Sequence, residues 1–469
     1  MPLVHLAVCL MAGIVIGRFL VVGWPLLPVF IVAVLLALAL WKYENLQSVA
    51  IAVCFLVLGM LLMERQKASL QENWPEEACF EAVVVSEPIE KPKTMAVDVM
   101  TVIGGHTVKC YLYKDDRSRA LTVGDGLKIQ LRKDIRFVPS WKWQRTQVSL
   151  KGLSRIDRSR IWFLKLRSRL LMRMRAGSAD RGETFDTDAY AVISAMALGD
   201  KSALSRELRD TYSVTGASHV LALSGLHLGI IYTLLSLLIV RRRWQTVSQI
   251  IIILSIWAFV FLVGMSASVV RSAVMLTVYA LMSLGHRDKM SVNTLAFTAI
   301  VMLLFSPQSL FDVGFQLSFM AVLAILLLVP LFMRVFSLEF FMSYQFVKWL
   351  WGMLAVSLAA QLGTAPLVAY YFGRFPTYFL LTNFIVVPAA TLILYLSLAV
   401  LLIPSLAYLL LYMVSVLNAV LTRIAAIPGA SIEGLHPTPL QVVMAYVIIA
   451  ATFLLVLQVR RPTSPERGW

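Results

Sequence analysis

Ser224 and His227 lie three residues apart in an apolar stretch, a spacing that places both side chains on one face of a helix. A hydroxyl beside an imidazole is the pattern of a nucleophile and its general base. No acidic residue lies nearby in the sequence to orient His227, and the surrounding residues do not form a nucleophile elbow. The pattern therefore argues against a hydrolase.

The other residues that carry chemistry do not form a recognisable cofactor site. The six histidines contain no H-x-H-x-D cluster, and no group of His, Cys and Asp has the spacing of metal ligands. The sequence has no phosphate-binding loop of the G-x-x-x-x-G-K-[ST] type. We therefore predict that the protein is not an enzyme, holds no metal, needs no cofactor and hydrolyses no ATP.

Several polar residues interrupt apolar segments, where an ionisable group is costly and marks a functional candidate by default. Arg271 lies in one such segment, and Asp312 begins another. One interpretation is a polar, water-filled passage lined by His219, Ser224, His227, Arg271, Asp312, Gln316, Gln361, Thr364 and Asn383. The alternative is structural: Arg271 and Asp312 form one buried ion pair, and His227 hydrogen-bonds a neighbouring backbone group.

The composition indicates that membrane helices position these residues. Of the 469 residues, 59% are hydrophobic and only 14% are charged, whereas a soluble domain carries about 25% charged residues. A membrane-spanning helix needs roughly 20 apolar residues. About twelve segments meet this requirement, near 4–22, 25–41, 48–63, 219–240, 247–264, 267–285, 291–306, 310–333, 348–371, 377–403, 405–427 and 440–458. We predict a polytopic α-helical membrane protein, with the segment 377–403 broken at Pro388.

Basic residues between these segments predict the topology, because cytoplasmic loops carry an excess of Lys and Arg. We place the run 241–243 in the cytoplasm and step outward from it. The same side then receives Lys42, Arg287, Lys289, Arg334, Lys348, Arg460 and Arg461. Among the short outer loops only Arg374 is basic, so both termini are predicted inside and residues 64–218 outside.

A soluble domain, residues 64–153, is predicted after the three N-terminal helices of residues 1–63. Three segments alternate with period two, as strands do, and glycine turns separate them: 97–99, 108–112 and 127–131. We expect a small β-barrel of the OB type. Because this domain is predicted outside the cytoplasm, Cys79 and Cys110 are candidates for a disulfide, with two buried thiols as the alternative.

Residues 154–218 are predicted to form a basic amphipathic helix and connecting helices. An apolar stripe at helical spacing consists of Phe163, Leu166, Leu170 and Met174. This pattern favours a helix on anionic lipid headgroups. The second interpretation, which does not exclude the first, is contact with nucleic-acid phosphates through Arg158, Lys165, Arg169 and Arg173.

Four blocks of sequence then follow in a fixed order. They read LGDK at 198–201 with TGASHVLALSGLH at 215–227, GMSASVVRSAVM at 264–275, DVGFQLSF at 312–319 and QLGTAPL at 361–367. In this order they resemble the ComEC competence family. Residues 219–469 resemble the transmembrane channel domain of that family, and the insert resembles its N-terminal soluble domain.

The resemblance implies a channel in the bacterial inner (cytoplasmic) membrane that takes up single-stranded DNA during natural transformation. Many members carry a C-terminal metallo-β-lactamase-like domain, thought to degrade the strand that does not enter. This sequence lacks that domain and its metal cluster. We therefore expect a separate nuclease and separate DNA-delivery proteins as partners, besides the lipid bilayer and single-stranded DNA. A homodimer is compatible with a channel.

The main alternative is a secondary transporter or exporter of small molecules. It shares the helix count, the predicted break at Pro388 and the buried polar groups. It explains neither the basic outer domain nor the four ordered blocks. Strand-binding surfaces combine cations with aromatic platforms, for which the candidates are Tyr111, Tyr113, Trp141 and Trp143, although such aromatics are more often core residues or lipid anchors. Salt-sensitive binding of single-stranded DNA by residues 79–176 discriminates between the two functions.

Overall fold

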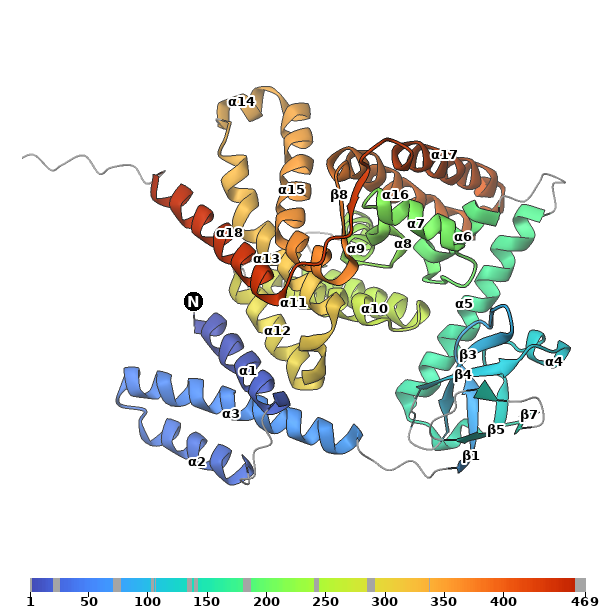
Figure 1. The fold of residues 1–469 in the computed structure, drawn as a ribbon, viewed down its shortest axis with the longest axis horizontal. Helices are drawn as coiled ribbons and strands as arrows, with labels where there is room; N and C mark the ends of the chain where they lie inside the picture. Colours follow the sequence, from blue (N-terminus) through green and yellow to red (C-terminus); the bar gives the residue numbers. More distant parts are fainter. Residues whose placement is uncertain are drawn as a thin grey trace, which may run out of the picture.

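The computed structural model describes residues 2–19, 26–70, 77–102, 105, 107–132, 137–138, 142–179, 187–239, 244–284, 292–336 and 338–459. Most of the chain is helical, and the sheet that follows the three N-terminal helices lies apart from them (Figure 1). Several basic residues that predict the topology, at 241–243, 287, 289, 460 and 461, lie outside the described residues.

The three N-terminal helices form a separate group: α1 (Pro2–Phe19), α2 (Leu26–Ala39) and α3 (Glu44–Leu70). α1 crosses α3 at two glycines. A Cβ on Gly13 would overlap the carbonyl oxygen of Leu56, and a Cβ on Gly59 would overlap that of Leu10. Small residues allow helix backbones to approach closely in a membrane, so this crossing depends on both glycines.

The insert contains a seven-stranded sheet in the order β6-β4-β3-β1-β5-β7, with β2 paired to β3. Its elements are β1 (Glu77–Val84), β2 (Ile89–Glu90), β3 (Thr94–Thr101), β4 (Thr107–Tyr113), the short helix α4 (Asp116–Arg119), β5 (Gly126–Arg132), β6 (Phe137–Val138), β7 (Trp143–Thr146) and η2 (Leu150–Gly152). All the pairings are antiparallel except that of β4 with β6. The three predicted strand segments lie in β3, β4 and β5.

Alternation along the strands builds the core of this domain. Val97, Val99, Leu112, Leu127 and Ile129 are fully buried in one cluster. Trp143 belongs to the same cluster and is 3% exposed, so it is a core residue and not a stacking platform. Trp141 lies outside the described residues.

The predicted disulfide between Cys79 and Cys110 is not formed, and Cys79 is an exposed free thiol. Cys79 lies on β1 and Cys110 on β4, with β3 between the two strands. Adjacent strands are about 4.8 Å apart, so the two Cα atoms are separated by more than a disulfide spans. Burial of Cys110 agrees with the alternative of a core thiol for that residue.

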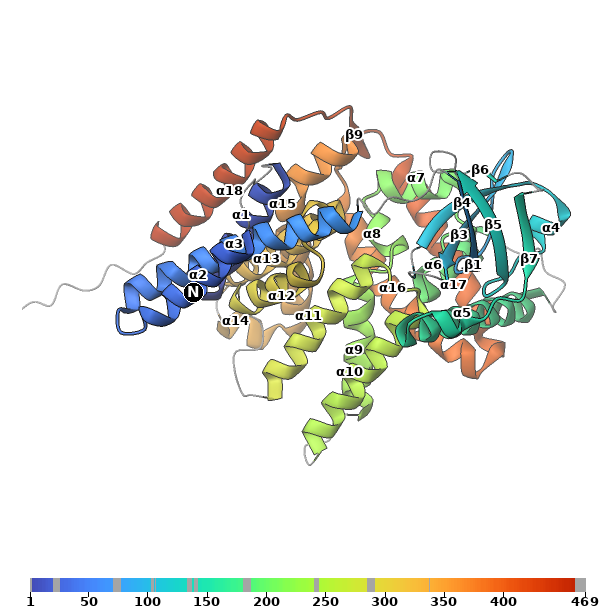
Figure 2. The same ribbon diagram turned by 90° about the horizontal axis from the view of Figure 1, so that it is seen from below.

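After the sheet, one long helix leads to a group of shorter helices: α5 (Arg155–Ala179), α6 (Thr187–Leu198), α7 (Arg206–Val214) and α8 (Ser218–Leu221). α5 runs along the sheet and on toward α6 and α17 (Figures 1 and 2). α6 is almost entirely buried, in a core cluster shared with the later helices.

The remaining elements form the helical bundle: α9 (Gly225–Ile239), α10 (Gln245–Leu262), α11 (Ala267–Leu284), α12 (Val292–Phe305), η4 (Pro307–Phe311), α13 (Val313–Met333), α14 (Leu338–Ser343), α15 (Gln345–Phe372), β8 (Arg374–Pro376), α16 (Phe379–Leu402), η5 (Pro404–Leu406), α17 (Ala407–Ala425), β9 (Ser431–Glu433) and α18 (Pro439–Val459). α13 and α15 pack as an antiparallel pair through Gly363, where a Cβ would lie 2.5 Å from Cβ of Ala324. β8 and β9 form a second, two-stranded sheet.

Among the described residues, seven helices are long and apolar enough to cross a membrane: Glu44–Lys67, Gln245–Leu262, Val313–Met333, Gln345–Phe372, Phe379–Leu402, Pro404–Ala425 and Pro439–Gln458. The chain is therefore a helical protein with multiple candidate membrane spans. The other predicted spans coincide with shorter apolar helices in α1, α2, α9, α11 and α12, so the count of twelve stays a prediction.

Two expectations about helix continuity are wrong. Pro388 lies inside α16, which continues from Phe379 to Leu402, because a helix in a bundle tolerates the single backbone hydrogen bond that proline removes. The predicted span 219–240 is instead divided. α8 ends at Leu221 and α9 begins at Gly225, so the interruption falls within the block that contains Ser224.

Candidate functional site

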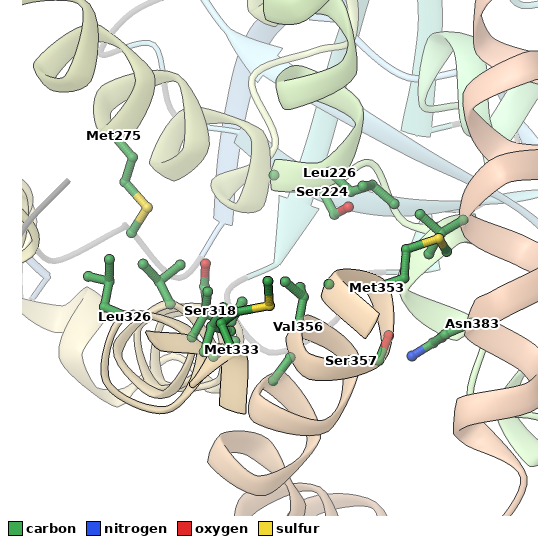
Figure 3. Close-up of a pocket in the computed structure, with 18 of the residues that line it drawn as sticks. Ser224, Leu226, Met275, Ser318, Leu326, Met333, Met353, Val356, Ser357 and Asn383 are labelled. Carbon is green, nitrogen blue, oxygen red and sulfur yellow. The ribbon is translucent and has the colours of Figure 1, made fainter. Parts of the chain in front are cut away.

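A cavity of about 1240 Å³ lies in the bundle, bounded by α8, α9, α11, α12, α13, α14, α15 and α16. Figure 3 shows α13 and α15 as one wall, with Ser318, Val356 and Ser357 on it. Ser224, the residue before α9, lies opposite this wall, and Asn383 of α16 lies at one side. The interruption between α8 and α9 therefore faces the cavity.

The cavity walls are mostly apolar, with polar side chains distributed among the helices. Its polar lining residues are His219, Ser224, Ser272, Thr294, Thr298, Ser318, Gln345, Lys348, Ser357 and Asn383. Of the residues predicted to line a passage, His219, Ser224 and Asn383 line this cavity and the other six do not. Asn383 Oδ1 is buried and has no hydrogen-bond partner in the described part of the chain, so it is available to a molecule in the cavity.

His227 closes the N-terminus of α9. The backbone N–H of Ser224 donates to His227 Nδ1 at 3.3 Å, and Ser224 Oγ lies 3.2 Å from the same nitrogen. A backbone N–H can only donate, so Nδ1 is the acceptor and Nε2 carries the proton of the neutral ring. His227, the third residue of α9, thus accepts from the N–H of the residue before the helix, which is one of the two bonds of a capping box. The structural interpretation of His227 is confirmed.

Substitutions at His227 separate capping from chemistry. Gln at this position also reaches back to the capping residue, so we expect His227→Gln to keep its thermal stability in detergent. His227→Ala loses the cap and is expected to be destabilised by about 1 kcal/mol, with a further loss from the void in a fully buried position. Equal loss of function in both variants at unchanged stability would contradict the capping role.

Arg271 and Asp312 form an ion pair between α11 and the start of α13. Arg271 Nη1 donates to Asp312 Oδ1 at 3.1 Å, and the same oxygen accepts the N–H of Phe315 at 2.9 Å, which caps α13. The Arg271 side chain is 5% exposed and that of Asp312 is 51% exposed. A Cβ on Gly314 would lie 2.6 Å from Arg271 Nη2, so this glycine makes room for the guanidinium. The predicted ion pair is therefore present, but only its Arg271 member is buried.

The three remaining predicted residues lie on the contact between α13 and α15 or along α15. Tyr371 donates to Gln316 Oε1 at 2.8 Å, and Gln316 Nε2 donates to the carbonyl of Leu310 at 3.0 Å. Thr364 Oγ1 donates within its own helix, to Ala360. Gln361 is half-buried on α15 and does not line the cavity.

The apolar side of α5 packs inside the protein. Ile161 and Leu164 lie in a cluster with strand residues of the insert, whereas Leu171 and Met174 join the cluster that holds α6 and α17. Phe163 stacks on Phe261 of α10, with 5.7 Å between ring centroids. This face is therefore not available to lipid, contrary to the interpretation that the sequence favours.

Arg167 was missed by the sequence reasoning. It lies on the inner side of α5, 8% exposed, and its Nη1 approaches the carbonyl of Val263 at the end of α10, at 3.4 Å. Burial lowers the pKa of the Arg167 guanidinium, and the carboxylates of Asp200 and Glu87 raise it. A cation near the C-terminus of a helix is stabilising. Its signal in the sequence is a basic residue on the apolar side of the helix.

The four predicted phosphate ligands, Arg158, Lys165, Arg169 and Arg173, are all exposed on the opposite side of α5. Among the described residues, no group of three or more His, Cys, Asp or Glu side chains is placed to share a metal ion. The candidate site is therefore the bundle cavity, with the basic side of α5 as a second surface.

Comparison with known proteins supplies the family. Residues 196–459 match the competence protein family, and this segment contains every residue that lines the cavity. The chain belongs to the competence protein family. The resemblance to this family that the four sequence blocks carry is confirmed.

Two relatives are similar over part of their length. ComE operon protein 3 of Bacillus subtilis (strain 168) is 29% identical over 338 residues, which is 68% of this chain and 40% of the relative. An uncharacterized protein of Aquifex aeolicus (strain VF5) is 34% identical over 198 residues, 42% of this chain and 44% of the relative. The chain thus spans less than half the length of either relative. No solved structure matches it.

Proposed function

We propose that this chain is the inner-membrane channel through which single-stranded DNA enters the cytoplasm during natural transformation. The observation that carries the proposal is the cavity of about 1240 Å³, which lies wholly within the part of the chain that matches the competence family. The interrupted helix between α8 and α9 opens on this cavity. Irregular backbone at membrane depth is tolerated where it is buried or lines a cavity.

The lining of the cavity suits a strand that must pass without being trapped. Serine and threonine hydroxyls, Asn383 and the single cation Lys348 offer phosphates weak and separate contacts. A dense set of cations would bind a polyanion too tightly to release it, and conduction requires sites that the substrate can leave. The apolar walls accept the flat faces of bases. No catalytic step is assigned to this chain.

The proposal includes an arrangement in the membrane. About twelve helices span the bilayer, with the insert on the extracytoplasmic side as an OB-like barrel. The parallel pairing of β4 with β6 and the position of β1 between β3 and β5 support a barrel of this type. Separate proteins deliver the DNA and degrade the second strand, and the channel is compatible with a homodimer.

One observation favours a second candidate function. The mostly apolar walls of the cavity suit an apolar small molecule, as expected of an exporter or secondary transporter. This function leaves the exposed cations of α5 unexplained.

The test follows labelled double-stranded DNA added to host cells that lack this chain. We expect label to accumulate outside the inner membrane, single-stranded label to be absent from the cytoplasm, and transformants to vanish, with all three restored by the intact gene. Unchanged cytoplasmic label in the deletion strain would exclude the channel and place the small-molecule transporter first.

A further inference from the structure

The exposed side of α5 carries an aromatic ring among its cations. Trp162 is 60% exposed, whereas the apolar side of this basic helix packs against the sheet and the bundle. Arg158 lies four residues before Trp162 and Lys165 three residues after it, so all three occupy one face. Arg169 continues the same face one turn further along.

The Trp162 ring contacts the neighbouring aromatic ring of the same helix. The rings of Trp162 and Phe163 meet in a T-shaped contact, with 4.9 Å between centroids and 86° between planes. Phe163 in turn stacks on Phe261 of α10. Trp162 therefore presents a large aromatic surface to solvent from a helix whose other side is held by the bundle.

A polar cleft of about 620 Å³ adjoins this face, between α5 and the sheet. Lys165 of α5 and Arg145 of β7 both line it, together with Thr146, Gln147 and residues 124–126. Gly124 has φ +93°, and a Cβ there would overlap the Lys165 side chain. The turn must therefore be glycine for Lys165 to enter the cleft.

The charges at the cleft favour an anion. Asp125, the carboxylate of the cleft, accepts from Arg145 Nη2 at 2.6 Å and from the N–H of Thr122 at 2.7 Å. It is thus already satisfied, and it holds Arg145 at the rim. Within the described part of the chain, Arg158, Lys165 and Arg169 have no acidic partner within 4.0 Å, so their charges are available to a ligand.

We propose that Trp162 and this cleft form a binding site for single-stranded DNA, with one base stacked on the indole and a neighbouring phosphate held between Lys165 and Arg145. Combining stacking aromatics with a positively charged groove is how proteins bind single strands without sequence preference. This inference rests on the proposed function, because the site would bind the same single strand before it enters the channel.

A lipid surface is the competing ligand and fits less well. Interfacial helices bury an apolar face in the bilayer, but the apolar face of α5 packs on the sheet, α10 and the cluster of α6 and α17. The exposed apolar residues of α5, Ile156, Trp162 and Met172, are separated by cations along the helix. A polar cleft beside the ring has no function in lipid insertion.

The experiment uses the purified full-length chain in nanodiscs and a fluorescent oligothymidylate of about 30 nucleotides. We expect Trp162→Ala to weaken binding about tenfold with an unchanged salt dependence, and Trp162→Phe to recover most of the affinity. The matched control is Trp244→Ala. Trp244 is as exposed as Trp162, at 61%, but it lies at the N-terminus of α10, whereas α5 contacts the C-terminal end of α10 at Phe261. This control should bind as the wild type does.

The phosphate contact is tested by the salt dependence of the affinity for oligothymidylate. Lys165→Gln should reduce the slope of log affinity against log salt by about 0.7, the value for one phosphate contact with a single strand. Lys42→Gln, an exposed lysine between α2 and α3, should leave the slope unchanged. Unchanged oligothymidylate affinity in Trp162→Ala would overturn the proposal. Quenching of the Trp162 fluorescence by brominated lipid would also overturn it. The Trp162 contribution is the difference in fluorescence between the wild type and Trp162→Phe.

Failure of this site and failure of the channel give different results. If Trp162→Ala binds oligothymidylate normally while the deletion strain loses DNA uptake, the binding site is wrong and the channel stands. If the deletion strain takes up DNA normally while binding depends on Trp162, the site stands and the channel does not.

Discussion

Replacing Gly352 with tryptophan should stop DNA uptake while leaving the protein folded in the membrane. Gly352 lies within α15 and lines the cavity. A Cβ at this position would meet no described atom within 4 Å, so the indole enters open space and not a packed interface. Alanine here should be neutral or stabilise the helix by up to about 1 kcal/mol. Uptake should then fall progressively through Ala, Leu and Trp, reaching the level of the deletion strain.

The chain supplies a matched control for this obstruction. Gly229 lies inside α9, and a Cβ there would also meet no described atom within 4 Å, but Gly229 does not line the cavity. Gly229→Trp should retain uptake at normal protein level. Normal uptake in Gly352→Trp, with protein level verified by immunoblot, would show that DNA does not pass through this cavity. Equal loss in both glycine variants would indicate a general effect on folding.

Removing the carboxylate of Asp312 should destabilise the protein more than the substitutions at His227 and Gly352. Asp312→Ala leaves the Arg271 guanidinium, 5% exposed, without its acidic partner. The same change removes the cap of α13 at Phe315. Loss of one member of a buried pair costs about 3–5 kcal/mol, and because Asp312 is half-exposed we expect the lower part of this range. Asp312→Asn keeps a capping side chain, so it should be destabilised less by about 1 kcal/mol. The thermal midpoint in detergent measures both.

A double substitution separates packing from transport at this ion pair. Arg271→Leu with Asp312→Asn removes both charges, and we expect it to be more stable than Asp312→Ala, because no buried charge remains unpaired. If the pair acts only in packing, the double variant should recover DNA uptake together with stability. Recovered stability without uptake would assign Arg271 a contact with the passing strand. A double variant no more stable than Asp312→Ala would contradict the buried-pair account.

Much of the local structure was predictable from the sequence. The period-two segments lie in β3, β4 and β5, and each long apolar segment contains a helix, because alternation and apolar length act through neighbouring residues. The cap formed by His227 is also local. Its signal was a Ser with a hydrogen-bonding residue three positions later, which a search for capping boxes would have found. The interruption at residues 222–224 could not be seen in the sequence, because the segment is mostly apolar on both sides of it.

The sequence by itself determined that this is a helical protein with multiple candidate membrane spans, a sheet-containing insert and the ordered blocks of the competence family. Only the tertiary structure decided how distant side chains are used. It directs the apolar face of α5 to protein instead of lipid, places Cys79 and Cys110 two strands apart, and leaves Trp162 exposed. It also brings together His219, Ser224 and Asn383 on one cavity. The physical reason is that pattern and propensity act over a few residues, whereas burial and strand order depend on packing between segments far apart in the chain.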